Sequence, residues 1–380
     1  MTAERRRRRR FALFAALIST AASLALGEVV ARLAGRRPLD GDPSHAYLWA
    51  EDTALGLRNR PFARIHNGEA DTWIETGPHG ERKGVGWDAA PVATTVIFVG
   101  DSTTLCAEVA DDETCPSQVA RRLSGGTAVR VVNAGVRGYS TLQSLRMADE
   151  WLERAPVRLV VYQFCDNDFI ENVIALYGTE VPLAALAGDE LRIHEPKVAP
   201  LAPGEAWRSP IRVGRGSRAL TAARRSSALF ETLYRPIRAA LARASGVPAV
   251  DATAWKEVVR RAEDAEGHAV LARLLRELAR RCRERGATLL VSRFTTSSRP
   301  DTAKLWPPLP TRKPVWETVV ATCREVGVEC VDPSHAFTDD EEGYCKKLRH
   351  GRYDGHYGEK GARTWAEQVA PSVERLLRTR

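Results

Sequence analysis

The chain has 380 residues, of which 44% are hydrophobic and 27% are charged. That length and composition exclude an intrinsically disordered chain and allow one large domain, or one domain with a smaller appendage. The formal net charge is +8, but residues 1–36 hold eight arginines against two glutamates, which leaves only +2 for the remaining residues. Nucleic acid is therefore not expected as a partner.

The amino terminus combines a basic stretch with an apolar run. Six consecutive arginines precede 16 uncharged residues, from Phe11 to Leu26. Because basic residues stay on the cytoplasmic side of a membrane, this order predicts export of everything that follows. Cleavage after Gly27, which would release a secreted protein, is the alternative to a retained single-pass anchor. The predicted segments are a basic cytoplasmic region over 1–10, a signal anchor over 11–30 and a juxtamembrane extension over 31–90.

A second basic stretch spans residues 208–243, with nine arginines and a single acidic residue, Glu231. A solvated helix face explains such a stretch, and contact with an acidic glycan or with phospholipid head groups is the competing hypothesis.

The seven cysteines fit no metal-binding spacing, because no Cys-x-x-Cys pair occurs. Burial as small apolar side chains is the favoured interpretation for each. In an exported domain, Cys106 with Cys115 or Cys330 with Cys345 are close enough in sequence to be disulfide candidates. The others are Cys165, Cys282 and Cys323.

From residue 95 onward, short apolar runs alternate with helical stretches. The runs are nearly continuous in apolar and β-branched residues, which is typical of strands buried on both faces of a parallel sheet. This alternation predicts an α/β protein with a three-layer α/β/α sandwich. The predicted strands cover 95–100, 129–135, 158–164, 287–294 and 328–333, and the predicted helices cover 116–123, 141–154, 254–285 and 361–379.

The stretch between the third and fourth predicted strands is long for a connection within a sandwich. We interpret residues of about 170–285 as an insertion, because segments of that size often serve as a lid or shape a substrate site. The main domain is expected over residues 91–380.

Two motifs offer the parts of a nucleophilic site. The first predicted strand ends in Gly100-Asp101-Ser102, which places a serine at the start of a helix, beyond the carboxyl end of the strand, where α/β sheets bind ligands. Simple capping of that helix is the alternative role for Ser102. Near the carboxyl terminus, Asp354 and His356 are two residues apart, so a loop could bring the carboxylate onto the imidazole, as in a serine triad.

Two further motifs offer hydrogen-bond donors or a close backbone approach. NAGVRGYST, at 133–141, follows the second strand and contains Gly135 and Gly138. FCDNDF, at 164–169, follows the third strand and contains Asn167, whose amide can donate to a developing oxyanion.

In their order and at these strand ends, the four motifs resemble the blocks of the SGNH, or GDSL, hydrolase family. The resemblance covers about residues 91–380 and rests on Gly-Asp-Ser, a glycine in the second block, Asn-Asp in the third and Asp-x-His in the last. Two features depart from the common pattern. Cys165 stands where the third block often has glycine, and one residue instead of two separates Asp354 from His356.

The resemblance implies a five-stranded parallel sheet in the order 2-1-3-4-5 and a serine enzyme that hydrolyses esters, such as an acylated glycan or lipid. It implies Ser102 as the nucleophile, His356 as the general base and Asp354 as the carboxylate that orients it. It further implies the backbone N–H groups of Ser102 and Gly135 and the amide of Asn167 as oxyanion donors. No metal and no organic cofactor is implied.

Three other functions remain open at this stage. An acyl-enzyme intercepted by a sugar hydroxyl would make the protein an O-acyltransferase that modifies an envelope or extracellular polysaccharide. If Ser102 and His356 do not meet, a non-catalytic carbohydrate-binding module remains. A metal-dependent phosphoesterase is the third alternative. No His-rich metal signature accompanies its candidate metal ligands, which are Asp101, Asp166, Asp168, Asp354 and His356.

Overall fold

The computed structural model divides the chain into two compact units. One comprises Met1–Pro43 and Arg212–Asp251, and the other comprises Ser44–Ile211 and Ala252–Arg380. Most of the second basic stretch, residues 208–243, lies outside the described residues. The structure describes residues 3–35, 48–88, 94–123, 129–175, 180–200, 223, 226–230, 232–234, 252–299, 303–348 and 351–379.

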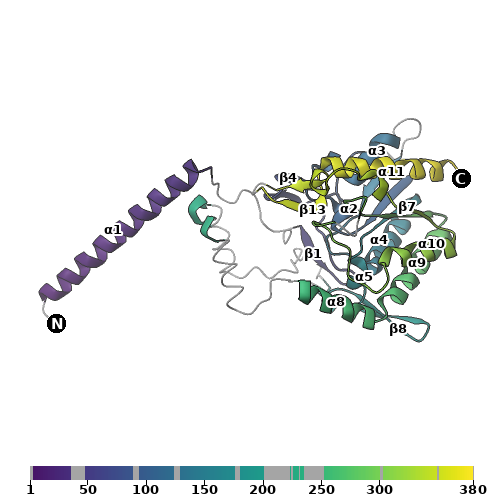
Figure 1. The fold of residues 1–380 in the computed structure, drawn as a ribbon, viewed down its shortest axis with the longest axis horizontal. Coiled ribbons are helices and arrows are strands. Elements are labelled where there is room, and N and C mark those ends of the chain that lie inside the picture. The colour runs from purple at the N-terminus through teal and green to yellow at the C-terminus, as the bar shows by residue number, and fades with distance from the viewer. Residues whose placement is uncertain are drawn as a thin grey trace. The chain divides into compact units, whose positions relative to one another are not determined.

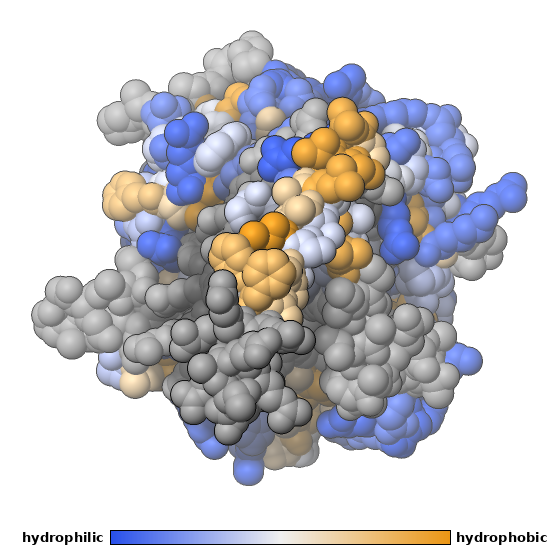
Figure 2. Space-filling view, turned by 90° about the vertical axis from the view of Figure 1, so that its left-hand side faces the viewer, coloured by the Kyte–Doolittle hydropathy of each residue, from blue (hydrophilic) through white to orange (hydrophobic). Residues whose placement is uncertain are grey.

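The smaller unit contains the amino-terminal helix α1 (Ala3–Leu33). Most of its large apolar side chains are exposed, among them Phe14 at 63% and Leu33 at 82%. Over Phe14–Leu33 the helix is long and apolar enough to cross a membrane, as the hydrophobic helix of a signal peptide also is. Figure 2 shows one face of the molecule, on which hydrophobic side chains (orange) lie among hydrophilic ones (blue). The helix is compatible with both predicted fates of this segment, the anchor and the cleaved signal.

The larger unit is built on a five-stranded parallel sheet (Figure 1). Its order, β6-β5-β7-β10-β11, is 2-1-3-4-5 when the strands are counted along the chain, so the predicted α/β fold is confirmed. Every strand begins and ends within two residues of its predicted range. The strands are β5 (Thr95–Gly100), β6 (Arg130–Asn133), β7 (Val157–Phe164), β10 (Thr288–Arg293) and β11 (Glu329–Val331).

Helices cover both faces of the sheet, which explains why its strands are apolar throughout. Successive side chains of a strand point to opposite faces. In β5, Ile97 and Val99 pack into the hydrophobic cluster of α4, α9 and α10, and Val96 and Phe98 pack into the cluster of α3 and α11. These helices are α3 (Cys115–Leu123), α4 (Thr141–Arg154), α9 (Gly267–Glu284), α10 (Val315–Val326) and α11 (Glu359–Arg378).

The helical stretch predicted over 254–285 is interrupted near its middle. It forms α8 (Ala252–Asp264) and then α9, with Glu266 between them in a left-handed conformation at φ 55°. A Cβ atom on Gly267 would lie 2.7 Å from the ring of Phe169. Helix α9 therefore starts at a residue that can lie directly against that ring, a tertiary contact that helix propensity does not reveal.

The residues before the sheet form two antiparallel hairpins. The hydroxyl of Tyr139 donates to the carbonyl of Leu57 at 2.8 Å, which ties the first hairpin to the sandwich. The N–H of Arg82 donates to the carbonyl of Asn133 at 2.8 Å, on the edge strand β6. The boundaries at 31 and 90 stay predictions. The hairpins pair β1 (Trp49–Asp52) with β2 (Gly56–Asn59), and β3 (Arg64–Asn67) with β4 (Thr72–Glu75).

Further small elements follow the strands of the sheet. The hairpin of β8 and β9 falls within the insertion of about 170–285, whose limits also stay a prediction. These elements are α2 (Ser102–Leu105), α5 (Asp168–Glu171), β8 (Leu183–Ala187), β9 (Glu190–His194), β12 (Cys345–Lys347), β13 (Tyr353–Tyr357) and 3₁₀ turns at Asp111–Glu113, Ser334–Ala336 and Glu341–Gly343.

All seven cysteines are free thiols, and six of them are buried. The backbone N–H of Cys115 donates to the sulfur of Cys106 at 3.4 Å, so these two candidates are neighbours. Cys330 interacts with Cys323, whereas the thiol of Cys345 faces the carbonyl of Gly355. Cys106 and Cys115 are therefore neighbours, but no disulfide joins the cysteines of either candidate pair.

Replacing Gly100 with alanine is expected to lower the free energy of unfolding by about 1–3 kcal/mol. Gly100 ends β5 at φ 152°, and an added Cβ would lie 2.3 Å from Thr104 Oγ1 and 2.7 Å from the carbonyl oxygen of Gln163. Urea unfolding measures the loss. Gly343→Ala is the matched control, since the nearest atom to its Cβ would be 3.9 Å away. Equal stability of the two variants would contradict the expectation.

Candidate active site

The turn after β5 presents Ser102 to the carboxyl end of the sheet. Asp101 caps α2, because its carboxylate accepts from the backbone N–H and from the hydroxyl of Thr103, both at 2.8 Å. Ser102 itself is 7% exposed, and its Oγ lies 2.8 Å from Nε2 of His356. The serine side chain thus faces a histidine, and the capping role falls to the preceding aspartate.

Asp354 and His356 lie on the short strand β13, where a loop was expected. Residues two apart on a strand project from the same face, so the spacing brings the carboxylate to the imidazole. Oδ1 of Asp354 lies 2.5 Å from Nδ1 of His356 and accepts from the backbone N–H of His356 at 3.0 Å. A Cβ atom on Gly355, between them, would lie 2.8 Å from the ring of Trp306. Glycine therefore lets this strand run close to the segment that carries Trp306.

Charges around the imidazole shift the pKa values of both partners. Burial acts to lower the pKa of His356, but the negative charge of Glu108, followed by the hydrogen bond and charge of Asp354, outweighs burial and raises it above its ordinary value. Burial acts to raise the pKa of Asp354, but its hydrogen bonds with His356 outweigh burial and hold it well below its usual range. The positive charge of Arg137 lowers both values. The pair therefore favours a charged carboxylate beside an imidazole that accepts a proton readily.

Two of the three sequence-predicted oxyanion donors, Gly135 and Asn167, are engaged within the protein. The N–H of Gly135 donates to Oδ1 of Asn133 at 3.0 Å. The amide of Asn167 donates to Asp101 at 3.2 Å and to Glu171 at 2.8 Å, which places it beside the turn that carries the serine. Within the described part of the chain, the N–H groups of Ser102 and of Gly138, a turn residue at φ 76°, meet no acceptor.

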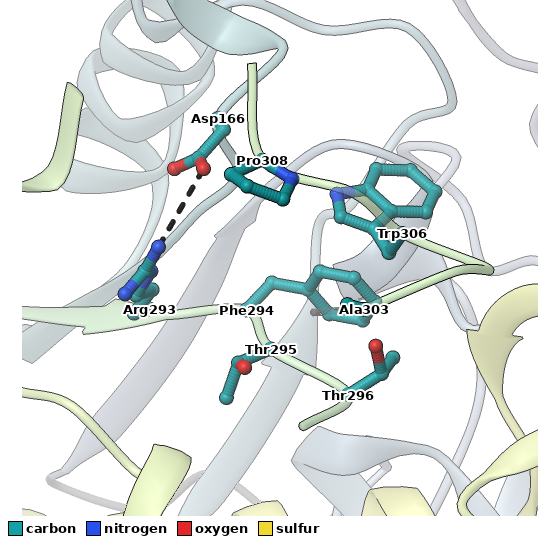
Figure 3. A pocket seen from close by; sticks show the side chains of 8 residues that line it. All are labelled: Asp166, Arg293, Phe294, Thr295, Thr296, Ala303, Trp306 and Pro308. Atoms are coloured by element: carbon teal, nitrogen blue, oxygen red, sulfur yellow. Dashed lines mark ion pairs between the residues drawn. The ribbon is translucent and has the colours of Figure 1, made fainter. Parts of the chain in front are cut away.

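A small cavity lies beside Trp306, and none of Ser102, Asp354 and His356 lines it. Its wall includes Trp306, whose ring meets that of His356 edge-on with centroids 5.5 Å apart. Figure 3 shows Arg293 paired with Asp166 at the other side, at 3.6 Å. The cavity volume is about 10 Å³, and the remaining lining residues are Phe294, Thr295, Thr296, Ala303 and Pro308.

Two charged residues at the site were missed by sequence reasoning. Glu108 is 2% exposed, and its Oε1 lies 3.9 Å from Nδ1 of His356 and 3.3 Å from the guanidinium of Arg137. The one available signal was an isolated acid in the apolar stretch CAEVA, six residues after the serine. Ligand atoms of Glu108, Asp354 and His356 lie within 4.8 Å of one another, as a metal would require. Because Arg137 already brings a positive charge to this group, we assign no metal to it.

Sheet order and site geometry together define an SGNH-type acylhydrolase. The model of the GDSL-like lipase/acylhydrolase family matches residues 98–364, and the chain belongs to that family. It is therefore an enzyme that hydrolyses ester bonds.

Three solved structures are similar to this chain at low sequence identity. The crystal structure of TesA is 14% identical and covers 74% of this chain and 99% of its own, with a TM-score of 0.38. A putative arylesterase from Agrobacterium tumefaciens str. C58 is 14% identical, with coverage of 74% and 99% and a TM-score of 0.35. A putative lipolytic protein of the G-D-S-L family from Desulfitobacterium hafniense DCB-2 is 11% identical, with coverage of 73% and 98% and a TM-score of 0.35. No curated protein matches the sequence.

Proposed function

We propose that this enzyme is a serine esterase that acts outside the cytoplasm through Ser102, His356 and Asp354. The observation that carries the proposal is the continuous line of contacts from Ser102 Oγ to His356 Nε2, at 2.8 Å, and from His356 Nδ1 to Asp354 Oδ1, at 2.5 Å. A hydroxyl, an imidazole and a carboxylate in this order provide a nucleophile, its base and the group that orients the base.

In the proposed reaction, Nε2 of His356 takes the proton of Ser102 as the serine oxygen attacks the ester carbonyl. Asp354 accepts the Nδ1–H and stabilises the imidazolium that forms. His356 then gives the proton to the leaving alcohol, and the acyl group remains on Ser102. A water molecule, deprotonated by the same imidazole, attacks the acyl group and releases the acid. Each proton thus passes through one nitrogen of His356, and the enzyme returns to its starting state.

The tetrahedral intermediate needs donors for its oxyanion. The N–H of Ser102 is one candidate donor, because it meets no acceptor among the described residues. The amide of Asn167 is another, because its hydrogen bond to Asp101 is long, at 3.2 Å, and a negatively charged oxygen can replace it. The N–H of Gly135 is held by Asn133. We therefore favour the N–H of Gly138, in the same turn, as the backbone donor in its place.

The substrate class follows from the chemistry of the proposed site. A serine activated by an imidazole attacks the carbonyl of an ester, and the acyl group is held on Ser102 until water releases it. We infer that the substrates are acyl or acetyl esters, such as those of an acylated glycan or lipid.

The amino-terminal segment supports action outside the cytoplasm. Six arginines in the first turns of α1 stand ahead of its apolar run, and positive charge at that end favours an orientation with the amino terminus in the cytoplasm. In this topology α1 tethers the enzyme to the membrane, and cleavage of the segment would release it in secreted form.

Labelling with a fluorophosphonate tests the proposal. The full chain, purified in detergent, is treated with the probe, and the modified peptide is mapped by mass spectrometry. We expect a single adduct on Ser102 and none in Ser102→Ala. A folded wild-type protein that takes up no probe and does not hydrolyse an aryl acetate would overturn the proposed mechanism.

A further inference from the structure

The segment after α2 brings a second carboxylate to the histidine. Glu108 is 2% exposed, and Oε1 lies 3.9 Å from Nδ1 of His356. The same oxygen faces Nη2 of Arg137 at 3.3 Å, while the buried Oε2 finds no hydrogen-bond partner among the described residues. Burying a carboxylate without full hydrogen bonding lowers the stability of the fold. The position of Glu108 next to the imidazole therefore suggests that its charge acts on His356.

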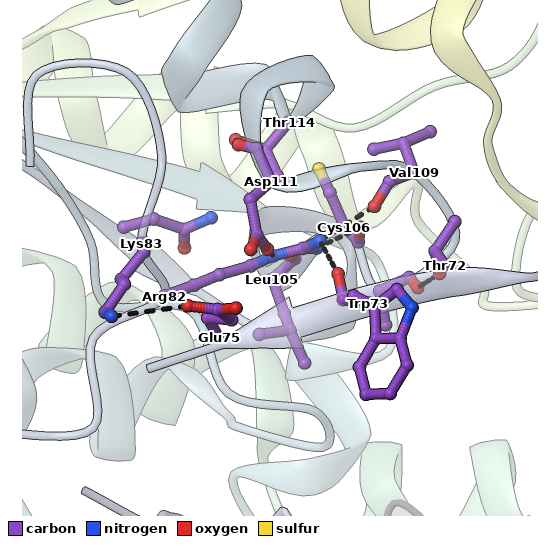
Figure 4. A network of polar contacts seen from close by, with 12 residues as sticks. Thr72, Trp73, Glu75, Arg82, Lys83, Leu105, Cys106, Val109, Asp111 and Thr114 are labelled. Carbon is purple, nitrogen blue, oxygen red and sulfur yellow. Dashed lines mark hydrogen bonds and ion pairs between the residues drawn. The ribbon is translucent and has the colours of Figure 1, made fainter. Parts of the chain in front are cut away.

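The backbone around Glu108 is fixed from outside the sheet. Figure 4 shows the side chain of Arg82, which is 0% exposed, reaching this segment. Its guanidinium donates to the carbonyls of Leu105 at 2.8 Å and Val109 at 2.7 Å, and also to that of Cys106. Carbonyls on both sides of Glu108 are thereby held, so the backbone that carries this side chain is fixed next to the histidine.

We propose that Glu108 is a second positioning carboxylate for His356, which stabilises its imidazolium by charge and takes over Nδ1–H when Asp354 is absent. This inference rests on the proposed function, because it assigns a task during proton transfer from Ser102. It adds a residue that the motifs of the sequence do not contain.

Distance and burial separate the tasks of the two carboxylates. At 3.9 Å, Glu108 is too far from Nδ1 for a hydrogen bond, and the single proton on that nitrogen is already donated to Asp354. Charge attraction persists at this distance and is weakened little where water is excluded. The side chain of Asp354 is 25% exposed against 2% for Glu108, so water screens Asp354 more.

Arg137 keeps the two states of the histidine in balance. Its guanidinium pairs with Glu108, so the carboxylate is compensated while His356 is neutral and attracts the imidazolium once it forms. The charged groups that face His356 are Glu108 from the segment after α2, Asp354 from β13 and Arg137 from the turn after β6. Removal of the Glu108 charge leaves Arg137 opposing the imidazolium, with Asp354 alone to hold it.

Titration of His356 by NMR tests the charge effect without relying on catalysis. In the full chain with labelled histidines, and with His356→Asn to assign the signal, we expect the midpoint to lie at lower pH in Glu108→Gln than in the wild type. Glu113→Gln is the matched control, because Glu113 lies on the same connection but bonds to Gln118; its midpoint is expected to stay unchanged.

Kinetics of ester hydrolysis test the reserve role of Glu108, which is to accept Nδ1–H when Asp354 is absent. Loss of the orienting carboxylate typically costs a serine triad about 10⁴-fold in kcat. Asp354→Ala is expected to cost only about 10²-fold here, because a change of rotamer lets the side chain of Glu108 close the 3.9 Å distance to Nδ1 once Asp354 no longer occupies that nitrogen. Asp354→Ala combined with Glu108→Gln is expected to reach the full loss. Alanine is used at 354 because an amide would donate to Nδ1 and impose the wrong tautomer.

An unmoved His356 midpoint in Glu108→Gln overturns the proposal. A double variant no slower than Asp354→Ala overturns the reserve role. Failure of the proposed function is recognised separately: a wild-type protein without labelling at Ser102 or turnover still gives an NMR midpoint, so the coupling between Glu108 and His356 is decided in either case.

Discussion

Ser102→Ala is expected to lower kcat for hydrolysis of a short-chain aryl ester by about 10⁴- to 10⁶-fold, because the acyl-enzyme can no longer form. The hydroxyl has one described partner, Nε2 of His356 at 2.8 Å, so its removal should leave the fold intact. Initial rates measure the effect. Circular dichroism and urea unfolding of the same sample check that the variant is folded.

His356→Ala and the double variant extend this test. Residues that act as one unit in catalysis lose activity in a non-additive way. Each single variant is therefore expected to be about as slow as the double, with the remaining rate due to binding and the oxyanion donors. Losses that multiply would mean that Ser102 and His356 act independently, which the proposed mechanism does not allow.

The elements that could be predicted from the sequence are those whose signal is local. The run TVIFVG matches β5 to the residue, because a strand buried on both faces must be apolar throughout and glycine ends it. Thr141–Arg154 was likewise predicted with its final bounds. Ser102, Asp354 and His356 were named individually, and the structure brings them together although 254 residues separate the serine from the histidine.

What the sequence did not reveal depends on contacts between distant segments. The break before α9 reflects the ring of Phe169 against Gly267. Glu108 meets His356 across 248 positions of the chain, and no spacing rule links them. The N–H of Gly135 is taken by the side chain of Asn133, so a glycine in a suitable turn does not by itself supply a free donor. Asp354 and His356 come together through the alternation of a strand, which explains why one intervening residue is sufficient.

Arg82→Met is expected to lower the free energy of unfolding by about 3–5 kcal/mol, since it removes the buried partner of an ion pair together with several hydrogen bonds. The guanidinium is fully buried and pairs with Asp111 at 2.7 Å. It also donates to four backbone carbonyls, which no methionine side chain can satisfy; they belong to Trp73, Leu105, Cys106 and Val109. Urea unfolding with matched m-values measures the loss.

Arg64→Met is the control, because its side chain is 67% exposed and its pair with Glu75 is a surface contact, expected to be worth less than about 1 kcal/mol. Arg82→Lys should fall between the two, since one ammonium group cannot reach every carbonyl that the planar guanidinium reaches. If Arg82→Met is no less stable than the control, the frame around Glu108 does not depend on this arginine. If it is less stable as expected, residues ahead of the first sheet strand belong to the folded enzyme, because they hold the segment that follows the nucleophile.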